Sequence, residues 1–396
     1  MHVILLSHEY PPFIFGGVGT FVKNLAHGLS RHGIKVTVIS GYPAPCTRMH
    51  QCNINQESKD GITVLKLPYP NIPPRHSMFQ MVNFKRLYKT VENINADVIH
   101  GQGGSTFPAL LNLRHLAPIV VTFHSSPTME MMMSLRSLTR GGSLGDFWTY
   151  VVGYPAWSYT FRRELQNSDK AVAVSKTLML ELVQELGERE SEKICEIHNG
   201  IDIETLDMEY ASVGHNEEEY DDTILFAGRL FWRKGALNLI KLAHLFRKEK
   251  LNFKVIVHGE GPLFGRMKKE IQTLGLANVE LKGFTNRAQL MKSMKRCKFV
   301  LIPSLYEACP MILLESMCLG KIPVMFNLPY SLEFTENGKY GIIAKDPKDM
   351  VKKLKTALVE SNLDSFCEKS KDFARRKYDI KNTASRYLDV YKAACN

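Results

Sequence analysis

The sequence lacks long apolar runs. None of its stretches reaches the roughly 18 uninterrupted apolar residues that a membrane-spanning helix needs. Residues 1–7 form too short an apolar segment for a secretory signal peptide and have no basic start. We therefore expect a cytoplasmic chain that does not cross a membrane.

Patterns for metal binding are also missing. The cysteines are scattered, without a Cys-x-x-Cys pair or a cluster with histidine at zinc spacing. No Asp-x-Asp motif follows an expected strand. We expect reduced, mostly buried thiols, no metal ion and no cofactor. The eight cysteines are Cys46, Cys52, Cys195, Cys297, Cys309, Cys318, Cys367 and Cys395.

Acidic residues are fewer than basic ones. The chain has 51 lysines and arginines against 40 aspartates and glutamates, a net charge of +11. Such a charge attracts phosphate, nucleic acid or an anionic membrane, and a generally basic solvated surface explains it equally well. Aromatic and basic recognition motifs for nucleic acid are absent and the basic residues are dispersed, so we expect no nucleic-acid partner.

Short apolar segments alternate with helical patterns along the chain. Hydrophobic residues make up 44% of the 396 residues, and this length predicts two domains. In the first half, we expect a helix over 20–32 and strands at 2–7, 35–40, 97–100, 118–123, 171–174 and 193–197. The alternation is typical of an α/β domain with a parallel sheet covered on both faces.

The same pattern restarts after residue 202 and an acidic patch at 217–222. Strands are expected at 223–226, 254–257, 279–282, 299–302 and 322–325, with helical patterns such as 235–246 between them. We therefore expect two doubly wound, Rossmann-like domains, 1–202 and 203–378, facing a central cleft. In such sheets ligands bind at the carboxyl ends of the strands.

Three glycines precede the first expected helix. Backbone N–H groups at Gly16, Gly17 and Gly19 can approach a phosphate at the positive end of the helix dipole. A dinucleotide fingerprint fits badly, because Val22 takes the place of its third glycine and no ribose-binding acid follows Ser40. A flexible connection stays the alternative.

The second domain opens with a strand, a basic turn and a helix over residues 224–235. Arg229 offers a rigid fork for two phosphate oxygens and Lys234 a mobile point charge, which together suit a diphosphate leaving group. The alternative is a pair of ordinary surface cations. Against it, cations at a helix N-terminus are unfavourable unless an anion lies there too.

Two glutamates follow the expected strand at 299–302. Pro310 suits the first turn of a helix whose exposed N–H groups would meet a phosphate or a sugar. Glu307 lies in the loop, and Glu315 lies well within the helix among apolar residues. A buried carboxylate needs partners, and ribose hydroxyls are good ones. The alternative is a glutamate on the solvent stripe of an amphipathic helix.

Together these segments resemble the retaining GT-B glycosyltransferases of glycosyltransferase family four. The likeness covers nearly the whole chain, from the glycines at 16–19 through 198–202, 228–235 and 259–262 to Glu307 and Glu315. Seven residues separate these two glutamates, as in the paired-glutamate signature of the family. One departure is Ala308-Cys309-Pro310, where many members carry a glycine-rich stretch, and it leaves the identity of the donor open.

The resemblance implies roles for individual residues. Gly16 and Gly17 would contact the donor diphosphate, Arg229 and Lys234 would neutralise it, and Cys309, Pro310 and Met311 would line it. Glu307 would hold hydroxyls of the transferred sugar, Glu315 would bind the ribose, and His124 would lie near the reacting carbon. A histidine just past a strand end is also where open α/β sheets meet ligands, and a purely structural histidine is the alternative. The closing helix, within 379–396, would cross back onto the first domain.

The implied reaction moves a sugar from a UDP-, GDP- or ADP-sugar to a hydroxyl group of a glycan, a lipid or a small molecule. We find no pair of acidic residues that would supply a nucleophile. We expect the diphosphate to leave with help from Arg229, Lys234 and the helix dipole, without a metal ion, and the acceptor to enter from the same face.

One segment of the sequence bears on the acceptor. Residues 127–163, rich in methionine and arginine, suit either a lipid-linked acceptor at the membrane periphery or ordinary helix packing. Two other classes stay open: a nucleotide-sugar epimerase on the same scaffold and a non-catalytic nucleic-acid-binding protein.

Overall fold

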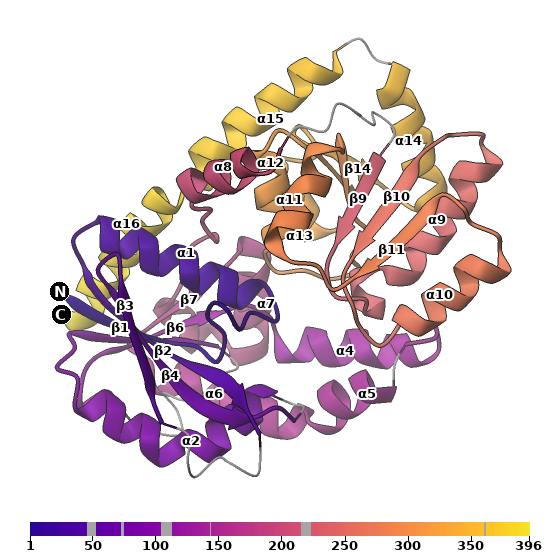
Figure 1. Ribbon diagram of the computed structural model, residues 1–396. Coiled ribbons are helices and arrows are strands. Elements are labelled where there is room, and N and C mark those ends of the chain that lie inside the picture. The colour runs from indigo at the N-terminus through magenta and orange to yellow at the C-terminus, as the bar shows by residue number, and fades with distance from the viewer. Residues whose placement is uncertain (46–52, 73–74, 104–112, 143, 215–222, 360–361) are drawn as a thin grey trace. The chain divides into compact units, whose positions relative to one another are not determined.

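The computed structural model contains two compact units. Figure 1 shows its helices and strands coloured by residue number. It describes all residues except 46–52, 73–74, 104–112, 143, 215–222 and 360–361. The first unit comprises Met1–Glu130, Val152–Asp202 and Tyr378–Asn396, and the second comprises Met131–Val151 and Ile203–Lys377. Cys46, Cys52 and the acidic patch at 217–222 lie outside the described residues.

The first unit is built on an eight-stranded sheet with the order β3-β4-β2-β1-β5-β6-β7-β8. All its neighbours are parallel except β3 and β4, which pair antiparallel. The central strands are apolar and buried, as in β1, because helices cover both faces. The strands are β1 (His2–Leu6), β2 (Lys35–Ala44), β3 (Asn55–Lys59), β4 (Ile62–Pro70), β5 (Val98–Gln102), β6 (Ile119–Phe123), β7 (Lys170–Ala173) and β8 (Ile194–Glu196).

The helices of the first unit follow the strands in alternation. They are α1 (Gly17–Arg31), α2 (Arg75–Glu92), η2 (Leu113–His115), α6 (Tyr154–Asn167), α7 (Lys176–Leu186), η4 (Glu188–Lys193) and α16 (Ile380–Cys395). The chain passes from the first unit to the second within α4 (Pro127–Leu138), and α5 (Leu144–Phe147) and η3 (Trp148–Val152) come before it returns. Of the helices in the described ranges, none is both long and apolar enough to span a membrane.

The second unit has a six-stranded, wholly parallel sheet. Its order, β11-β10-β9-β12-β13-β14, is the Rossmann order. The first three strands are added toward one edge of the sheet, and the next three, starting beside β9, are added toward the other edge. The strands are β9 (Thr223–Ala227), β10 (Lys254–His258), β11 (Val279–Gly283), β12 (Phe299–Ile302), β13 (Ile322–Phe326) and β14 (Ile342–Ala344). The predicted fold class, two doubly wound α/β domains, is confirmed.

The helices of the second unit include two short ones, η5 (Trp232–Lys234) after β9 and α12 (Met311–Cys318) after β12. The others are α8 (Ile203–Ser212), α9 (Ala236–Lys248), α10 (Phe264–Thr273), α11 (Arg287–Lys295), α13 (Pro329–Phe334), α14 (Pro347–Val359) and α15 (Leu363–Lys377).

The last helix, α16, is part of the first unit and completes its core. Close packing brings α16 against α1: a Cβ atom at Gly28 would lie 2.8 Å from the Ile380 side chain, so only glycine fits there. The hydroxyl of Tyr391 lies 2.8 Å from Nδ1 of His100, whose Nε2 lies 2.7 Å from the Thr122 hydroxyl. Burial lowers the pKa of His100 to about 3, so the ring stays neutral and needs both partners.

We expect Tyr391→Phe to lower the free energy of unfolding by about 1–3 kcal/mol, because it leaves Nδ1 of the buried His100 without its partner. Tyr159→Phe is the control, since Tyr159 is 64% exposed. Urea denaturation followed by circular dichroism measures both. Equal midpoints for the two variants would contradict the role of this hydrogen bond.

Candidate functional site

The loops after β9 and β12 lie at the reversal point of the second sheet. These two strands are neighbours, and the order of the strands reverses between them. Side chains and helix ends at the carboxyl ends of such strands line the crevice that open α/β sheets use for ligands. Arg229 and Lys234 follow β9, and Glu307, Cys309, Pro310 and Met311 follow β12. The topology therefore brings these predicted site residues to one edge of the sheet.

The turn after β9 is held by close backbone packing. Gly235 has φ +73°, and a Cβ atom there would lie 1.9 Å from the carbonyl oxygen of Pro303, so the position requires glycine. The backbone N–H of Leu305 donates to the carbonyl of Arg233 at 2.7 Å. The two loops are thus tied together by their backbones, which fixes the start of the Lys234 side chain.

Lys234 and Glu307 form an ion pair across the two loops. The Lys234 ammonium donates to both carboxylate oxygens of Glu307, at 2.5 and 2.7 Å, and the Ser304 hydroxyl donates to Oε1 at 2.7 Å. Glu307 is only 7% exposed, so these donors take the place of the water that a buried carboxylate loses. An ammonium has three donors. Lys234 is partly exposed and can give the third to a phosphate oxygen.

Arg229 is exposed at the same strand end. Its guanidinium carbon lies 4.4 Å from the centre of the Phe231 ring, so the ring supports the cation from one side. Next to this turn, Gly259 packs so closely on Gly228 that a Cβ atom would lie 1.9 Å from its carbonyl oxygen. The glycines at 259–262 therefore serve the packing of the turn that carries Arg229.

Helix α12 begins directly behind Glu307. Pro310 caps it with extended backbone (φ −73°, ψ 115°), so the N–H groups of Met311 and Ile312 lie in its first turn, where an α-helix provides no acceptor. Cys309 is half-buried in the loop before it. The positive end of the helix dipole and these N–H groups form a site for a phosphate.

Glu315 is buried, and so the alternative of a solvent-exposed stripe is wrong. It is 5% exposed, and Nη1 of Arg287 donates to its Oε2 at 2.9 Å. Nε of Arg287 donates in turn to Glu209 at 2.7 Å. Burial acts to lower the pKa of Arg287, but the two carboxylates hold it above its usual value. Within the described part of the chain, Oε1 of Glu315 has no hydrogen bond and can accept from a ligand hydroxyl.

Sequence reasoning missed Arg287 and Glu209. A signal for Arg287 was present: Asn286 and Gln289 form a capping box, so Arg287 is the first residue of α11. A cation at a helix N-terminus is unfavourable without an anion nearby, the same argument that singled out Lys234. Glu209 carries no such signal, because only the fold brings α8 to α11.

In the first unit, a glutamate occupies the end of α1. The helix begins at Gly17, three residues earlier than expected, because Glu9 accepts N–H groups of Phe15, Gly16 and Gly19 at 3.2, 3.0 and 3.3 Å. Burial acts to raise the pKa of Glu9, but the His8 ring and the backbone donors hold it below its usual value. The N–H of Gly16 thus has an internal acceptor, and the contact of Gly16 and Gly17 with a diphosphate stays a prediction.

His124 lies just past the carboxyl end of β6, as expected. Its Nε2 lies 2.9 Å from Oε1 of Gln102, and the Phe21 ring meets it edge-on with centroids 5.0 Å apart. Burial lowers the pKa of His124 to about 4, so the ring is neutral at neutral pH. When Nε2 donates to Gln102, Nδ1 is left as an acceptor. A neutral imidazole can thus meet an uncharged hydroxyl group here.

Comparison with known families and proteins gives matches along the chain. The family described as "Glycosyltransferase Family 4" matches residues 15–205, and "Glycosyl transferases group 1" matches residues 208–378. An uncharacterised glycosyltransferase of Methanocaldococcus jannaschii is 27% identical over all of this chain and 98% of its own length. The GDP-mannose:cellobiosyl-diphosphopolyprenol alpha-mannosyltransferase of Xanthomonas campestris is 25% identical over 100% of this chain and 97% of its own length.

Solved structures share the fold. Anabaena HepE in complex with UDP and glucose superposes with a TM-score of 0.72 at 16% identity, over 98% of this chain and 99% of that one. The sucrose-phosphate synthase of Thermosynechococcus elongatus gives 0.73 at 16% identity, over 99% and 98%. With both halves of the sequence matched and both sheets in place, the chain belongs to glycosyltransferase family 4, whose group 1 members are retaining, nucleotide-sugar-dependent enzymes with the GT-B fold.

Proposed function

We propose that this enzyme transfers a hexosyl group from a UDP-, GDP- or ADP-sugar to a hydroxyl group of a glycan, a lipid-linked sugar or a small molecule. The observation that carries the proposal is the Lys234–Glu307 pair at the reversal point of the second sheet. It places one cation for a diphosphate and one carboxylate for sugar hydroxyls within a single hydrogen-bonded unit. A scan of these donors for release of nucleoside diphosphate, with product analysis, tests it and separates transfer from epimerisation.

The roles of the donor-binding residues follow from their contacts. The diphosphate lies between Lys234, Arg229 and the first turn of α12, with Cys309, Pro310 and Met311 lining it. Its negative charge grows as the bond to the sugar breaks, so these groups stabilise the transition state more than the bound donor. Glu307 accepts hydroxyls of the sugar. Oε1 of Glu315 accepts a ribose hydroxyl while Arg287 holds Oε2.

The retained configuration places the acceptor on the face from which the diphosphate departs. As the bond between sugar and diphosphate breaks, the ring carbon takes on oxocarbenium-like character, and the acceptor oxygen then bonds to it from that face. The acceptor proton passes to the departing phosphate oxygen, which therefore acts as the base. No enzyme nucleophile forms part of the proposed reaction. We assign binding of the acceptor hydroxyl group to the first unit, where neutral His124 orients it, and donor binding to the second.

Residues 127–163 give partial support to a lipid-linked acceptor at the membrane periphery. The four methionines at 129 and 131–133 are buried or half-buried, which favours ordinary packing for them. In contrast, Leu144 is 72% exposed and Trp148 is 65% exposed. Exposed apolar side chains in a segment that also contains arginines suit an interface with anionic headgroups.

We predict that Glu307→Gln and Lys234→Ala each lower kcat by at least about a hundredfold, because each removes charge stabilisation that acts in the transition state. Glu249→Gln, at the exposed end of α9, is the control for loss of a carboxylate. Steady-state kinetics on variants with unchanged circular dichroism give the answer. Turnover close to that of the unchanged enzyme in either site variant would refute the assignment.

Arg287 should act on donor binding rather than on chemistry. We expect Arg287→Gln to raise the KM for the donor about tenfold with little change in kcat, since Glu315 loses the partner that orients it and the ribose contact is equal in ground and transition states. Arg287→Lys should restore part of the affinity, and Glu209→Gln should have a smaller effect. A drop in kcat at unchanged KM would contradict this role.

Turnover should survive chelation of divalent metal ions. Arg229, Lys234 and the α12 dipole are proposed to neutralise the leaving diphosphate, so EDTA should leave kcat within about twofold. Activity that disappears in EDTA and returns with magnesium or manganese would show that these groups are insufficient.

A further inference from the structure

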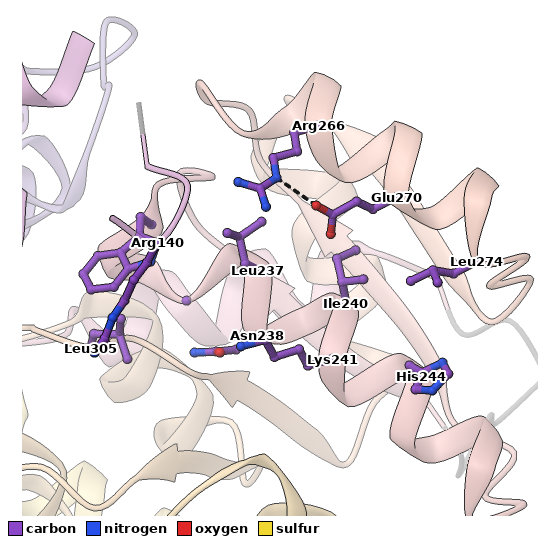
Figure 2. A pocket seen from close by; sticks show the side chains of 12 residues that line it. Arg140, Leu237, Asn238, Ile240, Lys241, His244, Arg266, Glu270, Leu274 and Leu305 are labelled. Carbon is purple, nitrogen blue, oxygen red and sulfur yellow. Dashed lines mark hydrogen bonds and ion pairs between the residues drawn. The ribbon is translucent and has the colours of Figure 1, made fainter. Parts of the chain in front are cut away.

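A pocket of about 710 Å³ lies within the second unit, in the groove between α9 and α10 (Figure 2). From α9 it is lined by Leu237, Ile240, Lys241 and His244, whose spacing places them on one face of the helix. Arg266, Glu270 and Leu274 line it from α10. Asn238 of α9, together with Arg140, Trp232, Gly235 and Leu305, completes the lining, and Lys234 and Glu307 are not part of it. We call this the α9–α10 pocket.

The α9–α10 pocket has an excess of positive charge. Its permanent cations are Arg140, Lys241 and Arg266, and its only lining carboxylate, Glu270, already accepts from Nε of Arg266 at 2.8 Å. The side chains of Arg140 and Lys241 form no ion pair or hydrogen bond with any residue that the structure describes. Cations gathered around a hollow repel one another, and an anion in the hollow relieves that repulsion.

One wall of the pocket is held in place by a specific contact. Nη1 of Arg266 donates to the carbonyl of Gly141 at 2.8 Å. Gly141 has φ +84°, and a Cβ atom there would lie 1.9 Å from that nitrogen, so only glycine permits the contact. The turn that carries Arg140 is therefore docked on α10. Arg266 contacts both this turn and Glu270, and it also lines the pocket.

We propose that the α9–α10 pocket binds the phosphoryl group of a small phosphorylated molecule, separately from the donor diphosphate. A phosphate monoester carries close to two negative charges, and guanidinium forks and an ammonium suit its oxygens. The apolar floor of Leu237, Ile240 and Leu305 accommodates the rest of the molecule.

The pocket adjoins the turn after β9 that carries Lys234. Trp232 and Gly235 line it, and Lys234 lies between them in the sequence. A ligand in the pocket therefore contacts the turn that positions Lys234. The phosphoryl group can belong to the acceptor or to a free effector, and both sources present the same chemistry to these residues.

Isothermal titration calorimetry of the full chain tests the site, with inorganic phosphate and glycerol 3-phosphate as probes. Saturating nucleoside diphosphate fills the donor site, and a parallel titration in the Lys234→Ala background weakens it. We expect Lys241→Gln to reduce the affinity for glycerol 3-phosphate about tenfold, through loss of a charge-assisted hydrogen bond. Lys248→Gln, on the same helix but outside the pocket, should leave the affinity unchanged.

Gly141→Ala provides the second variant, since it keeps every charge but displaces the wall of the pocket. It should weaken binding of glycerol 3-phosphate as well, whereas a diffuse attraction to surface charge would leave its affinity unchanged. Equal affinities in Lys241→Gln and Lys248→Gln, or the absence of binding to the unchanged chain at millimolar probe, would overturn the proposal. These titrations need no turnover, so their failure is separate from failure of the proposed transferase.

The transferase assay then distinguishes the two sources. Glycerol 3-phosphate that raises the KM for the acceptor identifies the pocket as the place of a phosphate carried by the acceptor. A change in kcat at saturating acceptor identifies a free effector. Either effect should disappear in Lys241→Gln, and an effect of equal size in that variant would contradict the site.

Discussion

The structure depends on one constraint: the central strands of both sheets are apolar and covered on their two faces, so polar chemistry is confined to the strand ends. Parallel strands end at the same edge, which brings together groups far apart in the sequence. Lys234 and Glu307 meet in this way although 73 positions separate them. The reversal of the Rossmann order beside β9 then opens the space between the loops that carry them.

The ion pair at this edge is better explained by preorganisation than by stability. A buried pair of charges loses about as much solvation as it gains in attraction, so it contributes little to net stability. What it provides is a carboxylate and an ammonium already oriented before a ligand arrives, with Ser304 holding the same oxygen. Arg287 does the same for Glu315. Each glutamate of the paired signature is thus oriented by a basic residue.

Much of the fold and the core of the site were predictable from the sequence, because apolar runs and the residues that follow them mark strands and their ends. β12 was predicted to the residue. The edge strand β3 was missed because all five of its residues are exposed and polar, so its pairing with β4 leaves no apolar pattern. Glu209 and the α9–α10 pocket were missed for a different reason: their partners come from helices whose approach no local pattern records.

The path of the chain also sets an order of events during synthesis. The first unit begins with β1 and ends with α16, and most of the second unit lies between these segments in the sequence. The ribosome therefore releases the whole of the second sheet before Tyr387 and Tyr391 exist to cover His100 and Thr122. Since domains generally fold as units, the later part of this chain has all of its strands before the earlier part can close its core. During translation the first sheet therefore has one face incomplete until α16 has been synthesised.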